Sequence, residues 1–220
     1  MNSFTEENYL KTIFHLSEKA DGPVATNSIS EVMGNKAASV TDMLKKLAEK
    51  DLINYVKYQG VSLTKKGRET AISIIRKHRL WEVFLVEKLA FKWDEVHEIA
   101  EELEHIKAPE LVDRLDEFLG HPTHDPHGDP IPNSRGEFQK NEWIILAKMN
   151  PGQTGILSGV SEHSSVFLQY LEQQGLLLGT RIKLEEIMAF DGSLKLLINQ
   201  NQSLSISREA AKNLLMLNEN

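Results

Sequence analysis

Histidine and glutamate recur at helical spacing in two segments of the chain. In residues 77–82 (KHRLWE), His78 and Glu82 are four residues apart, so a helix places them on one face. In residues 97–105 (HEIAEELEH), one stripe at i, i+4, i+7 and i+8 carries His97, Glu101, Glu104 and His105. Such groups are buried together only when something positive compensates them, and a divalent cation does this. The pattern therefore predicts a metal site.

The donor types limit which metal this site would take. The chain has no cysteine, which excludes thiolate ligands and a disulfide scaffold. Nitrogen and oxygen donors suit Mn²⁺ or Fe²⁺, although Zn²⁺ and Co²⁺ also bind such sites. A single His/Glu pair at i, i+4 is more often a solvated surface pair. Two such helices in one short segment favour the metal site.

A carboxylate-bridged di-iron enzyme is a remote alternative. That class needs two Glu-x-x-His motifs and two further helical glutamates. Residues 102–105 contain one such motif, from Glu102 to His105, but Ile75 stands three residues before His78, so the second copy is missing. The chain also lacks an H-E-x-x-H pair, a P-loop and a nucleophile elbow, and we expect no enzyme.

The first third of the chain predicts a winged helix-turn-helix. Two helical segments, residues 28–34 and 38–50, meet at the Gly34 turn and are followed by a hairpin in residues 52–64. The second helix of such a motif places its first residues at base edges in the major groove. The alternative is an ordinary helical hairpin with a solvated lysine face. We expect base-edge contacts from Lys36, Ala38, Ser39, Thr41 and Asp42, and phosphate contacts from Lys45, Lys46 and Lys57.

The net charge of −7 is unevenly distributed. Residues 1–72 hold 10 Lys/Arg and 9 Asp/Glu, whereas residues 73–140 hold 9 and 15. The acidity therefore lies in the middle of the chain, where it can collect cations, and the first segment can present a basic face. No apolar run approaches the roughly 18 residues of a membrane span, and the polar start does not resemble a secretory signal. We expect a cytoplasmic protein without membrane contact.

Changes in composition and hydrophobic pattern along the chain predict three domains. Residues 3–119 are mostly helical, and residues 120–140 form a linker with four of the seven prolines. From Trp143 onward, short apolar runs separated by glycine predict a small β-barrel interrupted by one helix near 165–174. The expected fold is mainly α with a small β part, in domains 1–72, 73–140 and 141–220.

The chain resembles the diphtheria toxin repressor and manganese transport regulator family over essentially its full length. The matching segments are NYLKTI at 8–13, RKHRLWEVFL at 76–85, VHEIAEELEH at 96–105, DPHGDPIP at 125–132, PGQTG at 151–155 and QGLLLG at 174–179. The resemblance implies a winged helix-turn-helix domain, a helical dimerisation domain and a C-terminal SH3-like (FeoA-like) domain. It also implies a homodimer that binds a palindromic operator in double-stranded DNA when loaded with metal, and represses metal-uptake genes.

Two metal sites follow from the resemblance. The first is similar to the family site formed by Asn8, Glu101, Glu104 and His105. The second joins His78, Glu82 and His97 with ligands from the linker, Asp125 and His127, and from the third domain, Glu162 or His163. The alternative for the linker is a solvated loop without ligands.

Two positions bear on the metal's identity. Glu101 stands where iron-responsive members of the family have cysteine, and glutamate there is similar to the manganese-responsive ones. Asn8 stands where manganese sensors have aspartate and iron sensors methionine; its neutral amide removes a negative charge. We expect Mn²⁺ as the cofactor, with Fe²⁺ and iron-uptake genes as the alternative. A protein switched by a small organic ligand remains a separate hypothesis, which chelator sensitivity tests.

Overall fold

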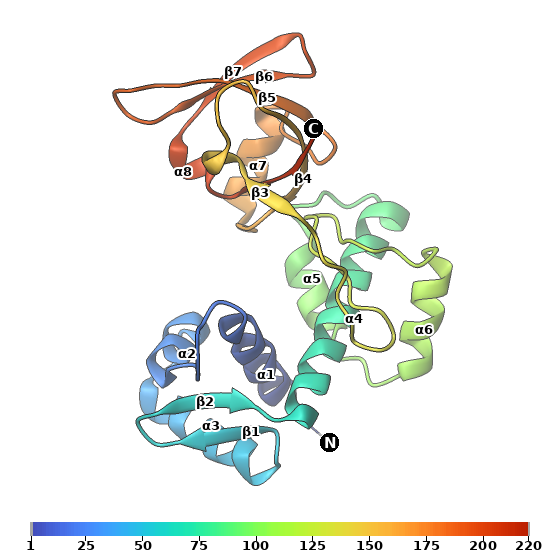
Figure 1. Ribbon diagram of the computed structural model, residues 1–220. Helices are drawn as coiled ribbons and strands as arrows, with labels where there is room; N and C mark the ends of the chain where they lie inside the picture. Colours follow the sequence, from blue (N-terminus) through green and yellow to red (C-terminus); the bar gives the residue numbers. More distant parts are fainter. Residues whose placement is uncertain (1, 220) are drawn as a thin grey trace.

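The computed structural model describes residues 2–219. Figure 1 shows an N-terminal, a central and a C-terminal domain in chain order. The N-terminal domain contains α1 (Phe4–Ser17), α2 (Thr26–Met33), α3 (Ala37–Glu49), β1 (Ile53–Val56) and β2 (Gly60–Leu63). The central domain contains α5 (Val96–Leu103) and α6 (Pro109–Phe118), and α4 (Lys65–Leu89) runs from the first domain into it.

Local sequence signals explain the N-terminal elements. Ser3 and Glu6 form a reciprocal capping box at the start of α1. Gly34 takes a left-handed conformation (φ 61°) between α2 and α3, which produces the tight turn of the predicted helix-turn-helix. The strands β1 and β2 pair antiparallel, from Ile53 with Leu63 to Val56 with Gly60, and form the predicted hairpin.

Helix α4 belongs to two hydrophobic cores. Its first half packs Ala71, Ile72 and Ile75 into the core of the N-terminal domain, mainly against α1. Its second half packs Leu80 and Leu85 into two smaller clusters with α5, α6 and the linker. The middle of α4 lies between these two cores, so His78 stands where the N-terminal and central domains meet.

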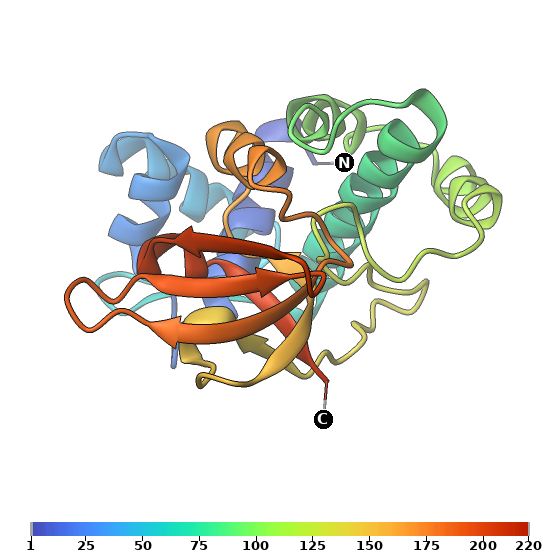
Figure 2. The ribbon, with the colours of Figure 1, turned by 90° about the horizontal axis from the view of Figure 1, so that it is seen from above.

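The C-terminal domain is a curved six-stranded antiparallel sheet (Figure 2). The strands lie in the order β3-β8-β4-β5-β6-β7, and helix α7 (Ser165–Gln173) packs Leu168 and Leu171 into its core. The bounds are β3 (Trp143–Ile145), β4 (Thr154–Val160), β5 (Arg181–Ile187), β6 (Leu194–Ile198), β7 (Gln202–Ile206) and β8 (Leu214–Asn218), with a 3-10 turn at Leu146–Lys148. Sequence patterns missed β8 and the short helix α8 (Arg208–Ala211).

The linker is an ordered part of the fold. Val160 donates its backbone N–H to the carbonyl of His127 at 2.9 Å, so the linker lies along β4. Gly128 has φ +90°, and a Cβ there would lie 2.2 Å from the Ser158 carbonyl oxygen, so this close approach needs glycine. On the other side, Gln169 of α7 donates to the Asp94 carboxylate at 2.7 Å. These contacts fix the C-terminal domain against the central one.

Among residues 2–219, no helix is both long and apolar enough to span a membrane.

Candidate metal centre and nucleic-acid interface

Carboxylates of the central domain face helix α1 of the N-terminal domain. Glu104 is fully buried, and both of its oxygens accept hydrogen bonds from the Lys11 ammonium at 2.8 Å. Lys11 also contacts Glu101. We call the residues on the two sides of this contact the α1–α5 cluster. Its members are Glu7, Asn8, Glu101, Glu104 and His105.

Helix α5 ends earlier than the helical stripe predicts. Its last residue is Leu103, and Glu104 is its C-cap, with the backbone N–H still bonded to Ala100. His105 lies beyond the helix and turns toward α1, where its Nδ1 is 2.7 Å from Glu7 Oε2. Glu104 thus lies on the predicted face of α5, whereas His105 reaches the cluster from the turn that follows the helix.

The surroundings of the Asn8 side chain show whether the α1–α5 cluster suits a cation. Within residues 2–219, its Oδ1 atom is buried without a hydrogen-bond partner. On α1 it lies between Glu7, which contacts His105, and Lys11, which contacts Glu104. A buried carbonyl oxygen without a donor is costly unless something positive satisfies it. The residues present therefore fit a divalent ion held by oxygen and nitrogen.

Sequence patterns missed Glu7 as a member of this cluster. It is buried, and its carboxylate accepts the Nδ1–H of His105 when that tautomer is present. A carboxylate in this position fixes the imidazole and leaves Nε2 free to bind a metal. Its position directly before the proposed ligand Asn8 could have indicated that Glu7 lies near the site.

His78 connects two groups of predicted ligands. Its Nδ1 lies 2.6 Å from Glu104 Oε2, and its Nε2 lies 3.0 Å from Glu82 Oε1 and 3.2 Å from His97 Nδ1. Burial alone would lower the pKa of His78, but the hydrogen bonds to Glu104 and Glu82 raise it to about 9. The ligand atoms of His78, His97 and Glu101 lie within 4.8 Å of one another, so this structure groups His78 and His97 with Glu101 as well as with Glu82.

A second group, called the linker cluster, consists of Glu82, Asp125 and His127. All three are buried, and their ligand atoms lie within 4.8 Å of one another. His127 Nδ1 lies 3.7 Å from Glu82 Oε2, while its Nε2 lies 2.8 Å from the Trp93 carbonyl oxygen. When Nε2–H donates to that carbonyl, Nδ1 is available as a ligand.

The charged groups of the linker cluster shift one another's pKa values. Burial and the neighbouring Glu82 and Asp129 carboxylates raise the pKa of Asp125 to about 7, although Arg79 acts against this. Burial lowers the pKa of His127, but Glu82 and Asp125 overcome it and raise the pKa to about 9. Two buried carboxylates beside a buried imidazole suit a cation that holds both carboxylates ionised.

The two candidate third-domain ligands lie in different surroundings. His163 stacks on His127 with ring centroids 4.9 Å apart and lines the same cavity, of about 470 Å³, as His78 and Glu82. Glu162 is exposed and accepts a hydrogen bond from the Ser164 backbone N–H at 2.9 Å. The structure therefore brings His163, and not Glu162, to the linker cluster.

The outer face of α3 carries most of the predicted DNA contacts. Val40, Leu44 and Leu47 are buried on the inner face, which turns the polar side outward. Thr41 is half-buried, and its Oγ1 donates to the Ala37 carbonyl of its own helix at 2.9 Å. The Lys46 ammonium lies 3.1 Å from the Glu6 carboxylate. The exposed residues are Lys36, Ala38, Ser39, Asp42, Lys45 and Lys46.

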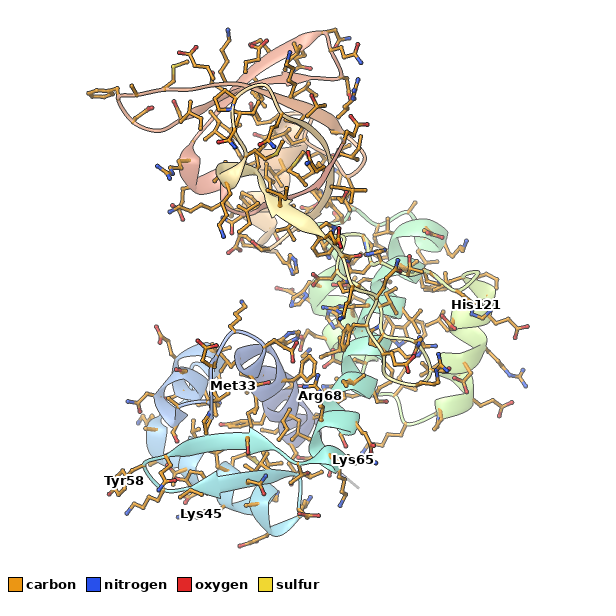
Figure 3. The ribbon with its side chains drawn as sticks, viewed as in Figure 1. Met33, Lys45, Tyr58, Lys65, Arg68 and His121 are labelled. Atoms are coloured by element: carbon orange, nitrogen blue, oxygen red, sulfur yellow. The ribbon has the colours of Figure 1, made fainter. Side chains whose placement is uncertain are left out.

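The hairpin ends in an exposed tip beside this face. Lys57 is exposed there, and its Nζ lies 4.9 Å from the ring centroid of Tyr58, which is itself 93% exposed. Figure 3 shows Tyr58 and Lys45 on the side of the N-terminal domain that faces away from the central domain. A polar, partly basic surface of this shape suits a DNA duplex.

Comparisons with known proteins cover all three domains. Family models described as "Iron dependent repressor, N-terminal DNA binding domain", "Iron dependent repressor, metal binding and dimerisation domain" and "FeoA domain" match residues 2–61, 64–133 and 144–216. A solved structure described as a manganese-dependent transcriptional repressor in complex with manganese is 32% identical, with a TM-score of 0.87, and the match covers 97% of this chain and 100% of that one. The chain belongs to the iron-dependent repressor family.

Other members of the iron-dependent repressor family match in part or in full. The manganese regulator SloR is 36% identical with a TM-score of 0.76, over 97% of this chain and 98% of that one. The iron-dependent repressor IdeR of Mycobacterium bovis is 35% identical over 128 residues, which are 58% of this chain and 55% of that protein. The chain thus spans about half the length of the curated relatives it matches. The family is one of repressors and not of enzymes, and Glu102, which the di-iron alternative requires, is exposed.

Proposed function

We propose that this chain is a repressor that binds operator DNA as a homodimer when loaded with Mn²⁺, and controls metal-uptake genes. The observation that carries the proposal is the α1–α5 cluster, in which the buried Glu104 and His105 of the central domain contact α1. These contacts are made by Lys11 and Glu7, and Asn8 between them has a buried carbonyl oxygen without a partner among residues 2–219. The donors are oxygen and nitrogen only, and a hard carboxylate at Glu101 favours Mn²⁺.

The residues of the cluster would link the two domains. Asn8 would hold the ion from α1, while Glu101, Glu104 and His105 would hold it from α5 and the turn after it. A bound ion would supply the positive charge that these carboxylates share. Because α1 packs on the DNA-binding helices, fixing α1 against the dimer fixes the separation of the two α3 helices, which must match about 34 Å on the operator. Metal and operator then favour the same arrangement and strengthen each other's binding equally.

An Fe²⁺-dependent repressor of iron-uptake genes is the second candidate. Imidazole and carboxylate ligands also suit Fe²⁺, and the relatives named IdeR are called iron-dependent. Asn8 has a neutral side chain, so it gives the cluster less negative charge than a carboxylate at the same position would.

Operator binding measured against metal concentration tests the proposal. The probe is a palindromic duplex selected from a random DNA library with the Mn²⁺-loaded protein. We expect the operator affinity at saturating Mn²⁺ to exceed that at saturating Fe²⁺, the latter without oxygen, and binding to be lost in chelator. The opposite order would favour the iron candidate, and binding that persists in chelator would contradict metal dependence.

Glu7→Gln should weaken Mn²⁺ binding without removing a proposed ligand. The amide no longer selects the Nδ1–H tautomer of His105, and loss of such a supporting carboxylate costs about 10- to 100-fold in metal affinity. Titration calorimetry measures the change, with Glu18→Gln at the exposed end of α1 as the control. Equal affinities for Glu7→Gln and the wild type would show that Glu7 does not orient His105 for metal binding.

A further inference from the structure

Lys11 places a fixed positive charge inside the α1–α5 cluster. Its side chain is only 13% exposed, and its ammonium donates to both oxygens of the fully buried Glu104 at 2.8 Å and also to Glu101. Lysine has three donors and no acceptor, so it cannot itself bind a metal ion. It neutralises the carboxylates that the proposed metal site also needs.

The contact joins the same two domains as the proposed metal site. Lys11 follows Asn8 by three residues on α1, so both side chains lie on one face of that helix. Glu104 belongs to the central domain, and its Oε2 also contacts His78 Nδ1 at 2.6 Å. Each oxygen of Glu104 therefore already accepts a hydrogen bond from Lys11, and a metal ion bound to either oxygen would stand next to the ammonium.

Resting on the function proposed above, we propose that Lys11 is a resident counter-cation that competes with the divalent ion for Glu104 and Glu101, and so sets the metal concentration at which the protein responds. A divalent ion and an ammonium on the same carboxylate oxygens repel each other strongly at such short range. The adjoining cavity of about 470 Å³, which Lys11, His78 and Glu101 line, gives the displaced ammonium room to withdraw.

This role predicts opposite effects with and without metal. Without a divalent ion, Lys11 holds α1 to the central domain and keeps buried carboxylates compensated. With the ion, it costs binding energy, because its contacts have to be given up. Removal of the charge should therefore destabilise the metal-free protein and tighten metal binding, whereas a lysine with a merely structural role would not tighten it.

The decisive variant is Lys11→Met, which keeps the length of the side chain and removes the charge. Titration calorimetry of the full chain with MnCl₂ should show one site per protomer that binds at least about tenfold more tightly, the scale of one lost charge-assisted contact. The melting temperature in chelator should fall, and its rise on addition of Mn²⁺ should exceed that of the wild type.

Lys19→Met is the matched control, because Lys19 lines the same cavity and is exposed. A general charge effect would tighten Mn²⁺ binding equally in both variants and would overturn the proposal. Lys11→Arg retains the charge, so its Mn²⁺ affinity should stay closer to that of the wild type than to that of Lys11→Met. If Lys11→Met fails to fold, an affinity for Lys11→Arg that is tenfold tighter than the wild type would still contradict the proposal.

The two proposals fail in different ways. Unchanged or weaker Mn²⁺ binding in Lys11→Met, while Glu104→Ala still loses one ion from an otherwise wild-type chain, would overturn the role of Lys11 alone. If Glu104→Ala binds as many ions as the wild type with the same affinity, the α1–α5 cluster is not a metal site and the proposed function fails first.

Discussion

Glu104→Ala is expected to abolish Mn²⁺-dependent operator binding while leaving a folded dimer. Glu104 is fully buried, and its carboxylate is the point where Lys11 of the N-terminal domain and His78 of the central domain converge. Removal of this carboxylate takes away a proposed ligand and leaves two positive groups facing each other. Loss of the ligand weakens metal binding, and the two positive groups left unpaired oppose the contact between the domains.

Fluorescence anisotropy on the selected duplex measures this loss, and light scattering with circular dichroism reports the folded dimer. Glu104→Gln keeps the volume of the side chain and covers the case in which the alanine variant is unstable. Glu102→Ala is the matched control, because this neighbour is exposed. Operator binding with unchanged metal dependence in both Glu104 variants would disprove the mechanism.

His127→Ala and Asp125→Ala should each remove one Mn²⁺ ion per protomer. Both residues are buried beside Glu82, and the ordered linker presents them through the His127–Val160 and His127–Trp93 contacts. Loss of either leaves two of the three ligands whose atoms lie within 4.8 Å of one another. Burial and the neighbouring Glu82 and Asp129 carboxylates raise the pKa of Asp125 to about 7 although Arg79 lies 3.6 Å away, and a divalent ion beside it would lower that pKa.

Titration calorimetry or metal analysis after dialysis gives the stoichiometry of these variants. His121→Ala is the control, since this histidine belongs to the same linker but is 71% exposed and pairs with Asp116. Asp125 and His127 are buried, so the expected solvated loop is wrong for these two residues. A linker that packs without binding metal predicts wild-type stoichiometry in all three variants, and that result would remove the linker from the metal sites.

Helical spacing and turn residues were sufficient to predict much of this fold. The apolar positions of α3 and α4 and the turn at Gly34 are local signals, and the structure shows the elements they predict. The last strand, β8, was missed because Leu214–Asn218 is a short apolar run, which periodicity alone does not distinguish from a helix.

The contacts between residues far apart in the sequence are the part of the site that the sequence did not predict. The spacing on α5 indicated that His97, Glu101 and Glu104 share a face, but it gave no information on which helix would meet that face. The contacts of Glu7 with His105 and of Lys11 with Glu104 join residues more than 90 positions apart, as the structure shows. Such pairings depend on how α1 packs against the central domain, which a one-dimensional pattern does not contain.

The position of β8 bears on the order in which the protein is assembled during synthesis. This last strand lies between β3 and β4, so the C-terminal sheet stays incomplete until residues 214–218 have been translated. The core of the N-terminal domain, from Tyr9 to Ile75, needs none of those residues and is free to form earlier. All residues of the α1–α5 cluster, from Glu7 to His105, are translated before β4, whereas the linker cluster needs β4 and β8 to hold the linker in place.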